Sequence, residues 1–262
     1  MLGKIRACYK ESKLTDAPYN VQQWARAMLR ENGIKNADSV PLKVGEGWKV
    51  VGGRYIQMDR DGVDYLESNL AKNSLAVVKK ERSLLHESKH YHNGDFGKGI
   101  LFFSAAITPC MQAAFKNCFK RSLLLGMMGM MGDVCYGRYQ EAEADRFAFM
   151  NLSSVHKLEA IKNDLLGSAD RFEDNLLHHP FFDLREFNAL EEKARPVISG
   201  QLRRLNQKSL ECSENEKKLI DMKKKSLIGI ANFIFDYEHP SYRRRIAIAQ
   251  ECLDKRQQQD IS

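Results

Sequence analysis

The sequence has no long hydrophobic run. Its longest uncharged stretch, Ile100 to Phe115, has only sixteen residues and contains Pro109, and a second stretch from Ser122 to Gly132 has eleven. A membrane-spanning helix needs about 20 apolar residues, so neither stretch alone predicts one. The favoured interpretation is two buried helices, with a hairpin that enters a membrane as the alternative.

The sequence also lacks the cysteine patterns of a disulfide-stabilised protein or of a structural zinc knuckle. Its six cysteines form neither a C-x-x-C pair nor a series of short spacings, which argues against both classes. The first ten residues are too polar for a signal peptide. We therefore expect a cytoplasmic location, and peripheral or integral membrane association through residues 100–132 is left open.

Neither sign of charge dominates the chain. The 41 Lys and Arg residues exceed the 34 Asp and Glu residues by only seven, and the two signs are interspersed. So mild a balance predicts no nucleic-acid partner. The basic runs at 223–225 and 243–245 are typical of solvated helix faces, with binding to an anionic membrane surface as the alternative.

Helical patterning is what the sequence does contain. Apolar residues repeat at helical spacing after Pro18, and a second helix is predicted from the N-cap Ser74 to Gly94. The capping box Ser213–Glu216 opens a third helix that ends near Phe235.

One hairpin is predicted, from Trp48–Val51 and Tyr55–Met58 with Gly52 and Gly53 at the turn. We expect an α+β, mostly helical fold with this small hairpin at the rim of a cleft. The predicted organisation is a helical extension over 1–40, one domain over 41–255 with an apolar helical insert at about 96–135, and a tail over 256–262.

The segment His86-Glu87-Ser88-Lys89-His90 is an H-E-x-x-H motif. On a helix, residues i and i+4 lie on one face, so both imidazoles can reach a single cation. Glu87 lies beside them and can take a proton from a metal-bound water. The alternative is a charged, solvated helix.

A second acidic segment offers the third ligand that a zinc site needs. Glu141 and Asp145 lie one helical turn apart, so Glu141 can bind the metal while Asp145 accepts the free N–H of a ligating imidazole. Glu143 is the second choice as ligand. The alternative for the whole segment is a helix start that carries favourable negative charge.

These residues resemble a known family. His86-Glu87-x-x-His90-x-x-Asn93-Gly94-Asp95 is similar to the H-E-x-x-H-x-x-N-G-D signature of HtpX-like zinc metallopeptidases, the gluzincins that include CAAX prenyl proteases and Oma-like and BepA-like proteins. A second motif, E-x-x-A-D, corresponds to residues 141–145, and a third, H-P-x-x-x-x-R-I, to residues 239–246. The similarity covers about residues 44–250 in motif order.

The resemblance implies a zinc metalloendopeptidase of the gluzincin fold in residues 41–255, acting on a protein or peptide. It implies one Zn²⁺ per chain, held by His86, His90 and Glu141, with Glu87 as general base and Asp145 orienting a ligating His. It also implies that an extended peptide adds to an edge strand formed by Tyr55, Ile56, Gln57 and Met58.

Two further residues are candidates for the catalytic site. His239 or Arg245 would stabilise the oxyanion of the tetrahedral intermediate. Alternatively, His239 terminates a helix or occupies the open metal position. In that last case the chain is a catalytically silent or self-occluded metallopeptidase-like module for binding or chaperoning, with membrane association open.

Overall fold

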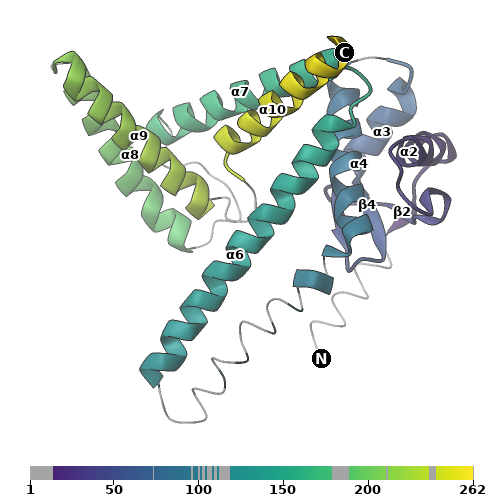
Figure 1. Cartoon of the computed structure of the whole chain (residues 1–262), viewed down its shortest axis with the longest axis horizontal. Coiled ribbons are helices and arrows are strands. Elements are labelled where there is room, and N and C mark those ends of the chain that lie inside the picture. Colours follow the sequence, from purple (N-terminus) through teal and green to yellow (C-terminus); the bar gives the residue numbers. More distant parts are fainter. Residues whose placement is uncertain are drawn as a thin grey trace. The chain divides into compact units, whose positions relative to one another are not determined.

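The computed structural model describes residues 14–72, 74–95, 97–99, 119–178, 189–210, 212–235 and 240–261, together with Leu101, Ser104, Thr108 and Met111. These residues are mostly helical and include a small mixed sheet of four strands, so the α+β class is confirmed (Figure 1). The chain divides into two compact units: residues 1–161 with 249–262, and residues 162–248.

The sheet belongs to the first unit and has the strand order β1-β2-β4-β3. β1 (Thr15–Asp16) pairs antiparallel with β2 (Leu42–Gly45), and β2 pairs parallel with β4 (Tyr55–Asp59). Alternate residues of β2 and β4 point into the core, which buries Leu42, Val44, Ile56 and Met58. One face of the sheet is thus fixed against the helices.

The predicted hairpin is confirmed as β3 (Lys49–Val51) and β4, which pair antiparallel. Gly52 and Gly53 both have positive φ, a conformation that side chains with a Cβ rarely adopt, and this permits the tight turn. The expected edge position of Tyr55–Met58 is wrong, because β4 pairs with β2 on one side and β3 on the other. Among the described strands, β3 is the one at that edge.

The helix after Pro18 is α2 (Tyr19–Glu31), which buries Val21, Ala25 and Leu29. These side chains share one hydrophobic core with the sheet and with Leu84 of the H-E-x-x-H helix. Residues 14–40 therefore belong to the first unit and are no separate extension. The expected single domain over 41–255 likewise differs from the observed division, in which residues 162–248 form a second unit.

Two long helices of the first unit carry the predicted motifs. α4 (Leu75–Asn93) begins as expected, since the Ser74 side chain accepts from the backbone N–H of Val77, and it ends at Gly94 in the left-handed conformation. α6 (Phe119–Met150) packs against α4. The unit also contains η1 (Ala37–Ser39) and α3 (Arg60–Asn69).

The second unit is helical in its described part. It contains α8 (Ala189–Leu210) and α9 (Glu214–Phe235), and the unit boundaries fall within α7 (Val155–His178) and α10 (Tyr242–Ile261). One half of the predicted capping box is present, because the Glu216 carboxylate accepts from the backbone N–H of Ser213 at 3.1 Å, and it also accepts from the Ser213 hydroxyl at 2.8 Å. α8 and α9 pack around Ile198, Leu202 and Ile228.

Sixteen residues of the expected apolar insert at 96–135, all of them before residue 119, lie outside the described residues, and residues 119–135 belong to α6. Among the residues that the structure does describe, no helix has the length and apolar character needed to cross a membrane.

Candidate metal centre

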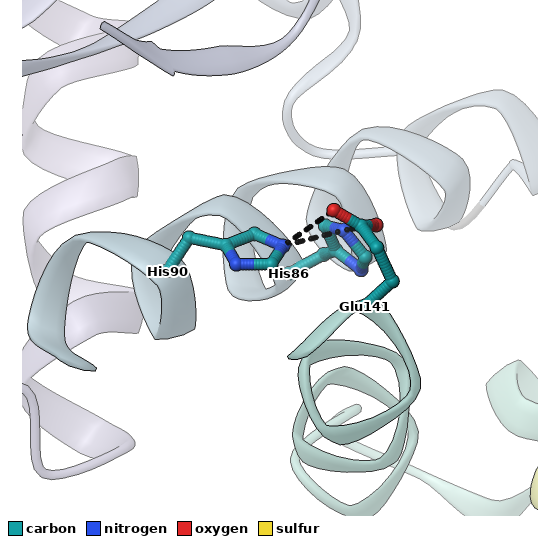
Figure 2. A group of neighbouring side chains, drawn as sticks. All are labelled: His86, His90 and Glu141. Atoms are coloured by element: carbon teal, nitrogen blue, oxygen red, sulfur yellow. Dashed lines mark hydrogen bonds and ion pairs between the residues drawn. The ribbon is translucent and has the colours of Figure 1, made fainter. Parts of the chain in front are cut away.

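Three of the predicted ligands come together between α4 and α6. His86 and His90 project from the same face of α4, one turn apart, and Glu141 projects toward them from α6 (Figure 2). Their donor atoms lie within 4.8 Å of one another. In the part of the chain that the structure describes, this is the one group of three or more such residues with that spacing.

The three residues form a triangle of close contacts, in which each histidine faces its own oxygen of Glu141. The Nε2 atoms of His86 and His90 are 3.2 Å apart. Glu141 closes the triangle with one carboxylate oxygen 3.1 Å from Nε2 of His86 and the other 3.2 Å from Nε2 of His90. Two imidazole nitrogens so close to each other and to a carboxylate are suited to share one cation.

The triangle fits a zinc ion. Ligands at about 2.0–2.1 Å from a tetrahedral Zn²⁺ lie about 3.3 Å from one another, and the distance between the two Nε2 atoms and the distance from each of them to its Glu141 oxygen are close to that length. A set of two His and one Glu is typical of catalytic zinc and leaves one position for water or substrate. The same donors also bind Co²⁺ and Mn²⁺.

Asp145 accepts a hydrogen bond from Nδ1 of His86, the ring nitrogen that does not face Glu141. Its Oδ1 lies 3.1 Å from Nδ1 of His86, and because a carboxylate only accepts, the ring N–H donates. The same oxygen accepts from the Arg82 guanidinium. Burial works to raise the pKa of Asp145, but the charge of Arg82 and the bond from His86 outweigh it and lower that pKa. Asp145 is thus an anion that fixes the ring with Nε2 toward the other ligands.

His90 has a corresponding partner in Asp95. Nδ1 of His90 lies 2.9 Å from Oδ2 of Asp95, five residues further along the chain. Gly94 makes this approach possible, because its positive φ ends α4 and turns the chain back toward the last helical turn. Each of the two rings therefore donates its Nδ1–H to its own carboxylate.

The carboxylates around the two histidines raise the pKa of both rings, against the effect of burial. Burial works to lower the pKa of His86, but its hydrogen bonds to Asp145 and Glu141 outweigh burial and raise that pKa to about 9. The pKa of Glu141 is held far below its ordinary value, because contact with both histidines outweighs the effect of burial. A metal ion that binds Nε2 of either ring must compete with a proton there.

Glu87 lies between the triangle and the sheet. Burial raises the pKa of its carboxyl above the ordinary value, while the charges of His86 and His90 and a hydrogen bond from the backbone N–H of Val50 oppose the rise. Val50 belongs to β3 and is paired with Ile56, whose own N–H donates toward β2. The N–H of Val50 consequently points away from the sheet, toward α4.

Other predicted candidates are not brought into the triangle. Glu143 forms an ion pair with Arg146 instead. His239 lies outside the described residues. Arg245 lies in the first turns of α10, where its backbone N–H donates to Ser241, and belongs to the second unit. The oxyanion role of His239 or Arg245 stays a prediction.

Three residues around the triangle received no role from the sequence. Arg82 precedes His86 by four residues, so the helical spacing that paired the histidines could have indicated it. Asp95 follows the Gly94 stop signal directly. Val50 had no local signal, because its contact with Glu87 depends on the packing of β3 against α4.

Comparison with protein-family models, with curated proteins and with solved structures gives no match in any of the three.

Proposed function

We propose that the chain is a zinc-dependent endopeptidase. The observation that carries the proposal is the triangle of His86, His90 and Glu141, in which the two Nε2 atoms lie 3.2 Å apart and each lies 3.1 or 3.2 Å from one oxygen of Glu141. Such distances suit the ligands of one tetrahedral metal. Each imidazole donates its Nδ1–H to a second carboxylate, Asp145 or Asp95, as is usual for histidines that bind metals. A charged, solvated helix would not bury its histidines against three carboxylates.

The chemistry requires a base beside the metal ligands, and Glu87 has that position. Zinc, when bound, would polarise a peptide carbonyl and increase the acidity of water. Glu87 would accept the proton of the attacking water and pass it to the amine of the leaving peptide. Because burial raises the pKa of Glu87, its carboxyl is suited to both accepting and returning that proton.

The substrate in this proposal is an extended peptide that adds to β3. Backbone groups of Val50 point out of the sheet on the side where Glu87 lies. A strand added at such an edge gains main-chain hydrogen bonds and would run past the general base. β3 thus takes the role that the sequence assigned to Tyr55–Met58.

Membership of the HtpX-like gluzincin family is part of the same proposal. It is supported by the order of the three motifs and by the presence of Glu141 opposite the H-E-x-x-H helix. Residues 44–250 are the extent of that resemblance.

The test is hydrolysis of casein and of quenched fluorescent peptides by the zinc-loaded chain. We expect cleavage that a chelator stops and added zinc restores. Glu87→Gln should keep its zinc and lose about 10²- to 10⁴-fold in rate, the usual contribution of a general base. Glu67→Gln, which changes an exposed carboxylate of α3, is the matched control and should cleave normally.

Two results would contradict the proposal. One is a Glu87→Gln variant that retains full turnover. The other is a zinc-loaded wild-type chain that cleaves no peptide, which would favour the alternative of a catalytically silent binding or chaperone module.

A further inference from the structure

Two facing rows of side chains run along the contact between α4 and α6. Each row has three members spaced four residues apart, so that each occupies one helix face: residues 82, 86 and 90 on α4, and residues 141, 145 and 149 on α6. The rows run in opposite directions. His90 contacts Glu141 at one end, and Arg82 contacts Asp145 near the other.

Arg82 is held at its end of the rows by two contacts. Its guanidinium donates to Oδ1 of Asp145, the oxygen that also accepts from His86. The guanidinium carbon lies 5.7 Å from the centre of the buried Phe149 ring. A planar guanidinium with a stacking partner and a carboxylate partner has little freedom to rotate.

The Asp145 carboxylate is in contact with Arg82 at a buried position. Its side chain is only 1% exposed, and Arg82 is 18% exposed, so water competes weakly for this contact. A rotation of Asp145 would move the oxygen that accepts from Nδ1 of His86. The imidazole would then lose the restraint that keeps its Nε2 directed at Glu141.

We infer that Arg82 is a positioning residue of the metal centre, which holds Asp145 so that His86 presents Nε2 to the metal. The inference rests on the proposed metal-binding function. Arg82 acts through Asp145 and takes no part in the chemistry. A purely structural ion pair between α4 and α6 is the competing explanation.

The experiment measures zinc affinity with a competing chelator and the visible absorption spectrum of the Co²⁺-substituted chain. We expect Arg82→Met to bind zinc about 10- to 100-fold more weakly, the usual effect of losing such an outer partner. Its cobalt spectrum should change, because the spectrum reports the ligand geometry. Arg82→Lys keeps the charge without the planar fork, and should regain part of the affinity.

Lys157→Met is the matched control. Lys157 pairs at 2.6 Å with Glu81, the buried neighbour of Arg82 on α4, and the two side chains are 19% and 5% exposed. This change breaks an ion pair of comparable burial that lies outside the two rows. We expect it to lower the stability of the chain and to leave zinc affinity and the cobalt spectrum as in wild type.

The inference is overturned if Arg82→Met keeps wild-type zinc affinity and cobalt spectrum, or if Lys157→Met weakens zinc binding equally. Should Arg82→Met fail to fold, an Arg82→Lys variant identical to wild type in both measurements would overturn it as well. Zinc binding that depends on Arg82 in a chain that cleaves no peptide would support this inference and contradict the proposed function. A wild-type chain that binds no metal would contradict both.

Discussion

His86 and His90 lie one turn apart on α4, and each donates through Nδ1 to a carboxylate, but the two carboxylates are held differently. Asp145 comes from α6, is 1% exposed and is contacted by the guanidinium of Arg82. Asp95 directly follows the end of α4, and its nearby cation is Lys98, which is 53% exposed and 4.0 Å away.

This difference separates a tertiary restraint from a local one. The position of the His86 ring depends on how α4 packs against α6, whereas the position of the His90 ring depends on the end of its own helix. Any change that shifts α4 relative to α6 should therefore displace the His86 ring more than the His90 ring. Comparing variants of the two carboxylates that contact His86 and His90 therefore tests how helix packing affects zinc affinity.

The largest effect should follow the loss of the carboxylate that both histidines share. Glu141→Gln removes the anion that contacts both Nε2 atoms, so we expect loss of stoichiometric zinc and of cleavage. Glu143→Gln is the control on the same helix, because Glu143 pairs with Arg146. Metal content and peptide hydrolysis of both variants check this, and a zinc-loaded Glu141→Gln chain would show that the ligand assignment is wrong.

The next largest effect should distinguish the two histidines. Asp145→Asn should weaken zinc binding about 100-fold and Asp95→Asn about 10-fold. Loss of a group that hydrogen-bonds a metal-binding histidine usually weakens binding about 10- to 100-fold, so the two variants should lie at opposite ends of that range. Asp145→Asn should also lower the free energy of unfolding by roughly 3 kcal/mol, because it leaves the mostly buried Arg82 without its anion.

Chelator competition and urea unfolding measure both quantities for the two variants. Equal losses of affinity, or a larger loss for Asp95→Asn, would contradict the distinction between the tertiary and the local restraint.

The smallest effect should come from Lys98, the exposed counterpart of Arg82. An exposed ion pair contributes no more than about 1 kcal/mol, so Lys98→Met should change zinc affinity only a few-fold. The same chelator competition checks this beside Arg82→Met. If the two variants lost affinity equally, burial would not be the reason for the difference between the histidines.

The local features of the fold were predictable from the sequence. Ser74 and Gly94 mark the two ends of α4 because a side-chain cap and a positive φ act on the backbone within a few residues. The turn at Gly52 and Gly53 follows from the same kind of preference. Helical spacing likewise indicated that His86 and His90 share a face.

Features that depend on distant contacts were missed or wrong. β2 is only four residues long and pairs directly with β4, although β3 lies between the two strands in the sequence, so no local pattern indicates that β4 is interior. The role of Arg82 depends on Asp145, which lies on another helix 63 residues along the chain. Glu141 was found because a zinc site with two histidines needs a third ligand, which is a chemical constraint independent of the fold.

The proposed function requires one metal ion at the triangle of His86, His90 and Glu141, and plasma mass spectrometry measures that metal content. We expect about one zinc per wild-type chain after purification and dialysis, and none in His86→Ala, with both chains shown to be folded by circular dichroism. A folded wild-type chain that takes up no zinc when zinc is supplied, or a His86→Ala chain that keeps it, would contradict the account.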